Sequence, residues 1–88
     1  MKQDILISLF EKLEKQIVHI QFTDSEESWL KIIDSSHVNL NGTVWADRIL
    51  SPNQPSPLEP HGIEFNIADI NKIKNQNNKL IFQKRFGV

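Results

Sequence analysis

The sequence predicts a small α+β domain, in which an N-terminal amphipathic helix precedes a five- to six-stranded, mostly antiparallel sheet or small barrel. Apolar residues recur at helical spacing up to about residue 16, and from residue 17 they alternate with polar residues, which is the period of a strand. A chain of 88 residues can bury only one modest core, so we expect a single domain over residues 1–88.

The helix is predicted over residues 4–16. Its apolar stripe has members every four residues, widened by two neighbours: Ile5, Leu9, Leu13, Leu6 and Phe10. Asp4 stands at the start of the stripe and is the expected N-cap, because its carboxylate can accept from the free amides of the first turn. The stripe needs a covering surface, and docking on the chain's own sheet is favoured over dimerisation.

The β-rich part is predicted over residues 17–86. Strict alternation in "IVHIQF" (17–22) indicates a half-buried strand, and "WLKIID" (29–34) is expected to return after a polar turn. Asn41-Gly42 between "HVNL" and "TVWA" is the strongest short signal for a hairpin, because both residues accept positive φ. A hairpin of these two segments is therefore expected.

The remaining strands follow a proline-rich stretch. "IEFNI" alternates strictly, "ADINKI" suits a single helical turn or a sharply bent strand, and "KLIFQKRF" is the expected last strand, with Leu80, Phe82, Lys84 and Phe86 on one face. The core is expected to contain the inward residues of all these segments: Leu9, Leu13, Val18, Ile20, Phe22, Ile32, Leu40, Ile63, Phe65, Ile67, Ile70, Ile73 and Phe82.

All four prolines lie between residues 52 and 60. Because proline donates no ladder hydrogen bond and disfavours helix in the preceding residue, an exposed loop is predicted over residues 51–61. Two P-x-x-P spacings suit a polyproline II ligand, but the usual flanking basic residue is missing. A stiffened surface loop is the favoured interpretation, and deletion of residues 53–59 is expected to leave the fold largely intact.

The segment "IEFNIADINKI" (63–73) resembles the fourth-strand region of small barrels of the SH3-like and Sm-like type, in which an alternating strand enters a short polar turn bearing Asp-Ile. The helix ahead of "IVHIQF" resembles the Sm-like order of elements. The resemblance implies a small-barrel topology. The proline loop, the absence of the second-strand glycine and the chain beyond the usual last strand depart from that pattern, so no functional residue is carried over.

Composition and motifs argue against several classes of function. The chain has no cysteine, its N-terminal segment lacks the uninterrupted apolar run of a secretory signal, and no stretch approaches the roughly 20 apolar residues of a membrane span. A cytoplasmic protein with no membrane contact is expected.

No catalytic or cofactor motif is recognisable. His19, His37 and His61 lack metal-ligand spacing, the three glycines form no phosphate loop, and no nucleophile motif is present. The acids at 24–27 are interpreted as a solvated turn. We therefore expect no enzymatic activity, no cofactor, no metal and no small-molecule substrate.

The first binding hypothesis is a protein-interaction or regulatory module. Trp29 and Trp45 stand near strand ends beside polar turns, and partly exposed tryptophan is enriched among interface hot spots. With Asp47 and Glu59 they are the candidate partner-binding residues, and an acidic rim would suit a basic partner. Self-association belongs to the same class. The alternative is that both tryptophans cap a small core.

The second hypothesis is binding of single-stranded nucleic acid, RNA in particular. Residues 1–71 hold five basic groups against eleven acids, whereas residues 72–88 hold five basic groups and no acid. The candidate residues interleave aromatic rings with cations on the last strand: Lys79, Phe82, Lys84, Arg85 and Phe86. A net charge of −1 argues against this class. Alternatively, the basic end neutralises the chain's own acidic part.

Overall fold

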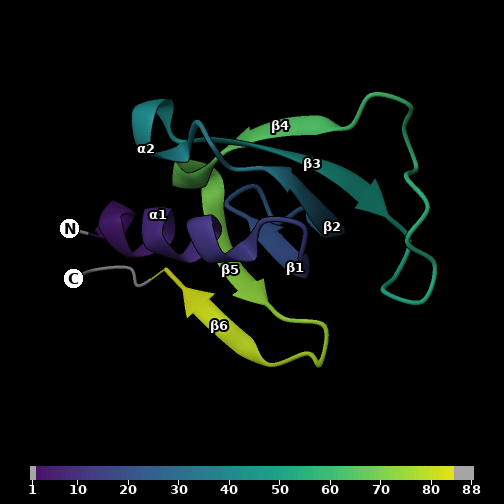
Figure 1. Ribbon diagram of the computed structural model, residues 1–88. Helices are drawn as coiled ribbons and strands as arrows, with labels where there is room; N and C mark the ends of the chain where they lie inside the picture. The colour runs from purple at the N-terminus through teal and green to yellow at the C-terminus, as the bar shows by residue number, and fades with distance from the viewer. Residues whose placement is uncertain (1, 85–88) are drawn as a thin grey trace.

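The computed structural model describes residues 2–84, with side chains from residue 5 onward (Figure 1). The elements in chain order are α1 (Lys2–Leu13), β1 (Ile17–Phe22), β2 (Glu27–Asp34), α2 (Val38–Asn41), β3 (Thr43–Ile49), β4 (Ile63–Asn66), the 3-10 turn η1 (Ile67–Asp69), β5 (Ile70–Lys74) and β6 (Leu80–Gln83). The predicted α+β class, with a helix ahead of an antiparallel sheet, is confirmed.

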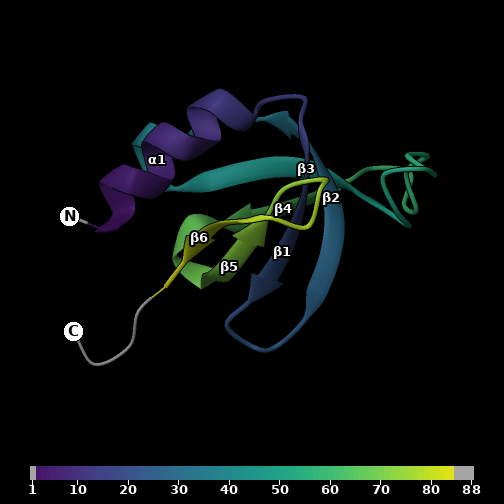
Figure 2. The same ribbon diagram turned by 90° about the horizontal axis from the view of Figure 1, so that it is seen from below.

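The six strands form one open sheet in the order β4-β3-β2-β1-β5-β6, and every neighbouring pair is antiparallel. β4 and β6 are the edge strands. In Figure 2, α1 lies along one side of the sheet, and residues 50–62 project from the opposite end of the molecule. The proline-rich segment is therefore a projecting loop between β3 and β4, as its composition predicts.

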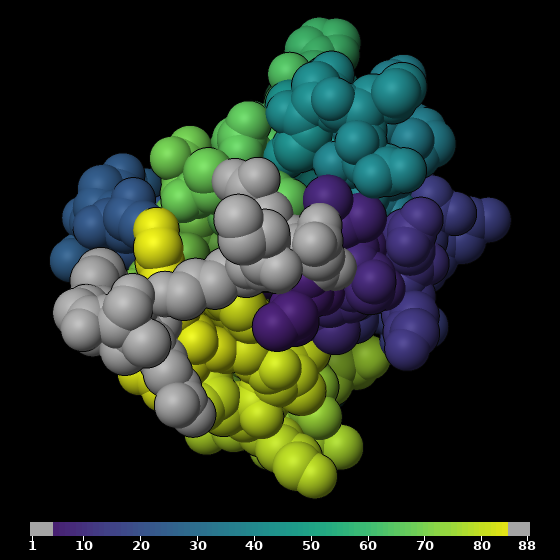
Figure 3. All heavy atoms as spheres, turned by 90° about the vertical axis from the view of Figure 1, so that its left-hand side faces the viewer, coloured from purple at the N-terminus to yellow at the C-terminus, as the bar shows by residue number. Residues whose placement is uncertain are grey.

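α1 packs on the chain's own sheet, as predicted. Leu6 and Phe10 are buried, and the Phe10 ring makes an edge contact with Phe65 of β4 at 6.0 Å between centroids. Phe65 in turn meets Phe22 of β1 at 5.4 Å. Figure 3 shows this end of the molecule, where α1 lies between α2 and the β5–β6 hairpin. Ile5, predicted within the buried stripe, is 63% exposed.

The bounds of α1 differ from the prediction. The helix begins at Lys2, so Asp4 lies inside its first turn and the N-cap prediction is wrong. It ends at Leu13 rather than at residue 16, because Lys15 adopts a positive φ of 67°. The Lys15 amide then donates to the Ile32 carbonyl at 2.7 Å, which ties the chain to β2 before β1 begins.

The core is one cluster between α1 and the sheet. Its buried hydrophobic members are Leu6, Phe10, Val18, Ile20, Leu30, Ile32, Val38, Val44, Ala46, Ile67, Ile70 and Ile73. The other predicted core residues pack against it with partial burial: Leu9, Leu13, Phe22, Ile63, Phe65 and Phe82. Leu40 is the exception, because it is 83% exposed on α2.

The predicted hairpin of "HVNL" and "TVWA" is wrong, because Val38–Asn41 form the helical turn α2. Gly42 ends that turn with a φ of 75°, and its amide donates to the Val38 carbonyl at 3.1 Å. A left-handed residue serves a helix C-cap as well as a tight hairpin. Just before α2, the Ser36 amide donates to the Asp34 carboxylate at 2.8 Å, and this hydrogen bond holds the pKa of Asp34 below its usual value.

The last strand also differs from its predicted alternation. Phe82 pairs with Ile73 and Leu80 with Lys74, so Ile81 is an extra residue in β6. Leu80 therefore lies on the same face of the sheet as Lys74 and is 46% exposed, whereas Phe82 lies on the opposite face and packs against the core. Upstream, "ADINKI" divides between the two predicted alternatives, because its first two residues belong to the helical turn η1 and the other four to strand β5. The Asn66 side chain caps η1 by accepting from the Ala68 amide at 2.8 Å.

Candidate protein-binding surface

One face of the sheet packs against α1, and we call the opposite one the open face. Residues paired across antiparallel strands point to the same face. The pairing therefore sets Lys74 of β5, His19 of β1, Trp29 of β2 and Ile49 of β3 in one row across the open face. Lys72, Gln21 and Glu27 form the next row. The pairing thus brings aromatic, apolar and charged side chains from four strands together.

A hollow of about 260 Å³ lies at the β3 end of the first row, and we call it the Trp29 groove. It is lined by residues of β1, β2 and β3 and by two leucines, one just before the proline-rich stretch and one within it: His19, Glu27, Ser28, Trp29, Arg48, Ile49, Leu50 and Leu58. Ile49 is 3% exposed, whereas Leu50 and Leu58 are 63% and 55% exposed. The volume lies below the roughly 300 Å³ at which typical small-molecule sites begin. It suits one side chain of a larger partner.

The proline loop is held beside β3 at residues 58 and 59. The Leu58 amide donates to the Arg48 carbonyl at 2.8 Å. The Arg48 guanidinium donates through Nε to Glu59 Oε1 at 2.7 Å, and its Nη2 atom reaches the same oxygen. These contacts keep Leu58 at the rim of the groove. They also pair Glu59, predicted as part of an acidic rim, with a cation of its own chain.

The β1–β2 end of the groove is acidic. Glu27 Oε1 lies 3.6 Å from His19 Nε2, and the Glu27 side chain is 54% exposed. The His19 ring makes an edge contact with the Trp29 ring at 5.0 Å between centroids and 67° between planes. Because a separation of 3.6 Å exceeds that of a hydrogen bond, the Glu27 carboxylate keeps its capacity to accept.

The two tryptophans predicted as partner-binding residues lie apart, with Trp29 on β2 and Trp45 on β3. Trp29 lines the groove, whereas Trp45 is 42% exposed and pairs with Glu64 at the sheet edge. Four residues of strand, roughly 13 Å, separate Trp45 from the groove residue Ile49. Asp47, the third candidate, is paired across the strands with Lys31. Of the four candidates, Trp29 alone is among the residues that line the Trp29 groove.

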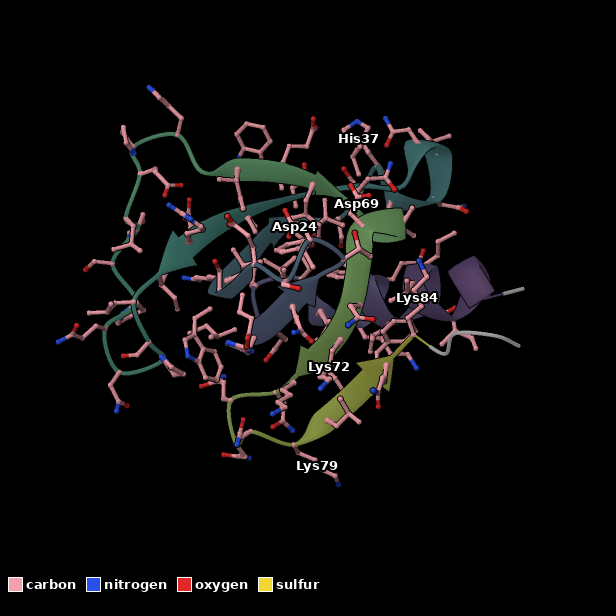
Figure 4. The ribbon with its side chains drawn as sticks, turned by 180° about the vertical axis from the view of Figure 1, so that it is seen from behind. Asp24, His37, Asp69, Lys72, Lys79 and Lys84 are labelled. Carbon is pink, nitrogen blue, oxygen red and sulfur yellow. The ribbon has the colours of Figure 1, made fainter. Side chains whose placement is uncertain are left out.

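The nucleic-acid candidates lie along β5 and β6. Figure 4 shows Lys72, Lys79 and Lys84 distributed along this hairpin. Phe82 packs against the core, and the Lys84 amide donates to the Asn71 carbonyl at 2.7 Å. Arg85 and Phe86 lie outside the described residues.

Several groove residues were not predicted as site residues: His19, Ile49, Leu50 and Leu58. One signal was present in the sequence. Ile49 and Leu50 are adjacent apolar residues at the end of a strand, and neighbours on a strand point to opposite faces. The two side chains therefore cannot both point into the core, and at least one apolar side chain is expected on the other face at this strand end.

Among the side chains of residues 5–84, no three His, Asp or Glu groups stand close enough together to hold a metal ion. No helix in the described part of the chain is both long and apolar enough to cross a bilayer. No family model matches the chain, and neither a curated protein nor a solved structure matches it. The resemblance to small barrels stays a prediction.

Proposed function

We propose that this chain is a non-enzymatic binding module whose protein partner inserts an apolar side chain into the Trp29 groove. The observation that carries the proposal is the groove itself, in which a tryptophan and a buried isoleucine meet two exposed leucines. Exposed apolar residues gathered beside a polar rim are typical of interaction sites. Tryptophan in such a hollow is among the commonest interface hot spots.

Two further features support a partner larger than a metabolite. The groove has room for about one side chain, so a bound segment must make its other contacts on the open face around it. The rim is also anchored, since Leu58 and Glu59 are fixed to Arg48 by hydrogen bonds. A rim held in place before binding loses less conformational entropy when the partner arrives.

Selection from a displayed library of random peptides, each about 12 residues long, tests this proposal. Leu58→Asp introduces a charge at the groove rim and is expected to weaken binding of the selected peptides by at least about tenfold, the effect of a modest hot spot. Leu40→Asp makes the same change at a leucine that is 83% exposed on α2, and it should leave binding unchanged.

The location of binding is read from tryptophan fluorescence. The chain has two tryptophans, so Trp45→Phe leaves Trp29 as the single emitter. Peptides that enter the groove should change its emission. A library that yields no binder, or binders that leave Trp29 emission unchanged and tolerate Leu58→Asp, would refute the proposed function.

Single-stranded nucleic acid is the second candidate, favoured by one observation. Lys74 shares the row of His19 and Trp29, and Lys72 lies in the next row, so cations and aromatic rings occupy the same face. Such a combination suits stacking of bases with contacts to phosphates.

Anisotropy with mixed-sequence RNA and DNA at about 50 and 200 mM salt separates the two candidates, because counterion release makes phosphate binding steeply salt-dependent. Binding lost in Lys72→Glu/Lys74→Glu would favour the open face. Binding lost only in Lys84→Glu/Arg85→Glu would favour the C-terminal strand. No binding at low salt would leave the protein partner.

A further inference from the structure

The charges that line the Trp29 groove are not balanced. Arg48 is compensated within the chain, because its guanidinium donates to Glu59 at 2.7 Å and makes a second contact through Nη2. Glu27 has no such partner, since His19 Nε2 at 3.6 Å is its only ion-pair contact among the side chains of residues 5–84. The groove therefore combines an apolar wall with one half-exposed carboxylate that can accept further hydrogen bonds.

We infer that the segment bound in the Trp29 groove carries an arginine or lysine side chain beside its apolar anchor, and that this cation pairs with Glu27. The inference rests on the proposed function and adds the chemical class of the partner. An apolar side chain would lie against Trp29 and Ile49. A basic group on the same segment would reach Glu27, which lines the same hollow. A charge-assisted hydrogen bond to a carboxylate is stronger than a neutral one.

The surrounding charges orient the segment. Lys72 lies in the row of Glu27, two strands away across β1, and Lys74 lies beyond His19 in the groove's own row. Strands are spaced about 4.8 Å apart, so Lys72 stands roughly 10 Å from Glu27 and repels a cation bound toward β5. The β1–β2 turn beside Glu27 is acidic instead, with exposed Asp24 and Glu26. The basic residue of the partner is therefore expected on the side of this turn.

The experiment compares peptides selected by the wild type with peptides selected by Glu27→Lys from the same random library. The wild type should enrich arginine or lysine near an apolar residue, and Glu27→Lys should enrich aspartate or glutamate at that place. Changing the basic residue of a selected peptide to glutamine should weaken its binding to the wild type by about tenfold. The same change should cost nothing in Glu27→Gln, which makes the pair a double-mutant cycle.

Glu64→Gln is the matched control, because Glu64 is an exposed acid on the same face but pairs with Trp45 at the sheet edge. It should retain the tenfold preference. Peptides that change Trp29 emission but show no preference for arginine or lysine would overturn this inference and leave the proposed function standing. A preference for arginine or lysine that survives Glu27→Gln would do the same. If no peptide reaches Trp29, both fail.

Discussion

Gly62 returns the chain from the proline loop to β4 at a point with no room for a side chain. Its φ is +69°, and a Cβ atom there would lie 2.9 Å from the Ala46 carbonyl oxygen and 3.0 Å from Asp47 Oδ1. The first of these is a backbone atom of β3, which cannot move without disturbing the sheet. Gly62 therefore lets the loop close against the strand that carries Ile49.

We expect Gly62→Ala to lower the free energy of unfolding by about 2–3 kcal/mol, because left-handed strain of roughly 1–2 kcal/mol adds to the clash with β3. Gly42→Ala is the comparison, since Gly42 also has a positive φ of +75° but the nearest atoms to its Cβ would belong to the Asn66 side chain, the closest at 3.3 Å. Its cost should stay near the strain alone, about 1 kcal/mol. Urea denaturation measures both, and equal losses would contradict a special constraint at Gly62.

Among the elements, those with a clear period were predicted and the others were not. The change from a period of about four to a period of two locates α1 and β1, and the pairing of β1 with β2 and β5 buries Val18 and Ile20 as expected. α2 was missed because Asn41-Gly42 fits a hairpin and a helix C-cap equally well. The burial of Val38 and the exposure of Leu40 distinguish the helical turn from the hairpin, and both depend on packing against residues distant in the sequence.

The groove could be predicted only in part, because it is built by contacts far apart in the sequence. Trp29 was a candidate because of its residue type and its place near a strand end. The pairing of Trp29 with Ile49 depends on the β2–β3 register, which shifts at Ile33. Leu58 lies beside the groove only because the loop folds back and its amide donates to the Arg48 carbonyl. A one-residue change of register moves a side chain to the other face of the sheet. Local patterns carry no information on such shifts.

The proline loop as an element is expected to contribute little to stability. None of residues 53–59 is buried. Their deletion removes the partly exposed Arg48–Glu59 pair, the hydrogen bond of the Leu58 amide and a turn within the loop itself, in which the exposed Gln54 donates its amide to the Ser51 carbonyl. Each is worth about 1 kcal/mol or less, so the free energy of unfolding should fall by less than about 2 kcal/mol. Peptide binding should be lost, because Leu58 is gone.

Urea denaturation of the deletion variant measures the first effect, and Trp29 emission with a selected peptide measures the second. A loss well above 2 kcal/mol would mean that the loop belongs to the packed structure. Retained binding would remove the loop from the site.

At the scale of the whole molecule, the two faces of the sheet have different roles. One face buries the core under α1, and the other carries the Trp29 groove. An isolated helix of 12 residues is marginal in water, so α1 depends on this packing. Phe10 links it to Phe65 of β4 and through Phe65 to Phe22 of β1. Stability and binding should therefore respond to different substitutions.

Phe10→Ala tests this division on the buried face. The side chain is fully buried, so its removal should lower the free energy of unfolding by about 3–5 kcal/mol, a large part of the total for a domain of this size. Ile5→Ala removes an apolar side chain from the same helix at a site that is 63% exposed, and it should cost less than about 0.5 kcal/mol. Leu58→Asp, on the binding side, should be equally mild in denaturation while weakening peptide binding by at least about tenfold. If Ile5→Ala costs as much as Phe10→Ala, α1 does not pack through Leu6 and Phe10. If Leu58→Asp unfolds the domain, the groove is part of the stabilising structure rather than a surface kept for a partner.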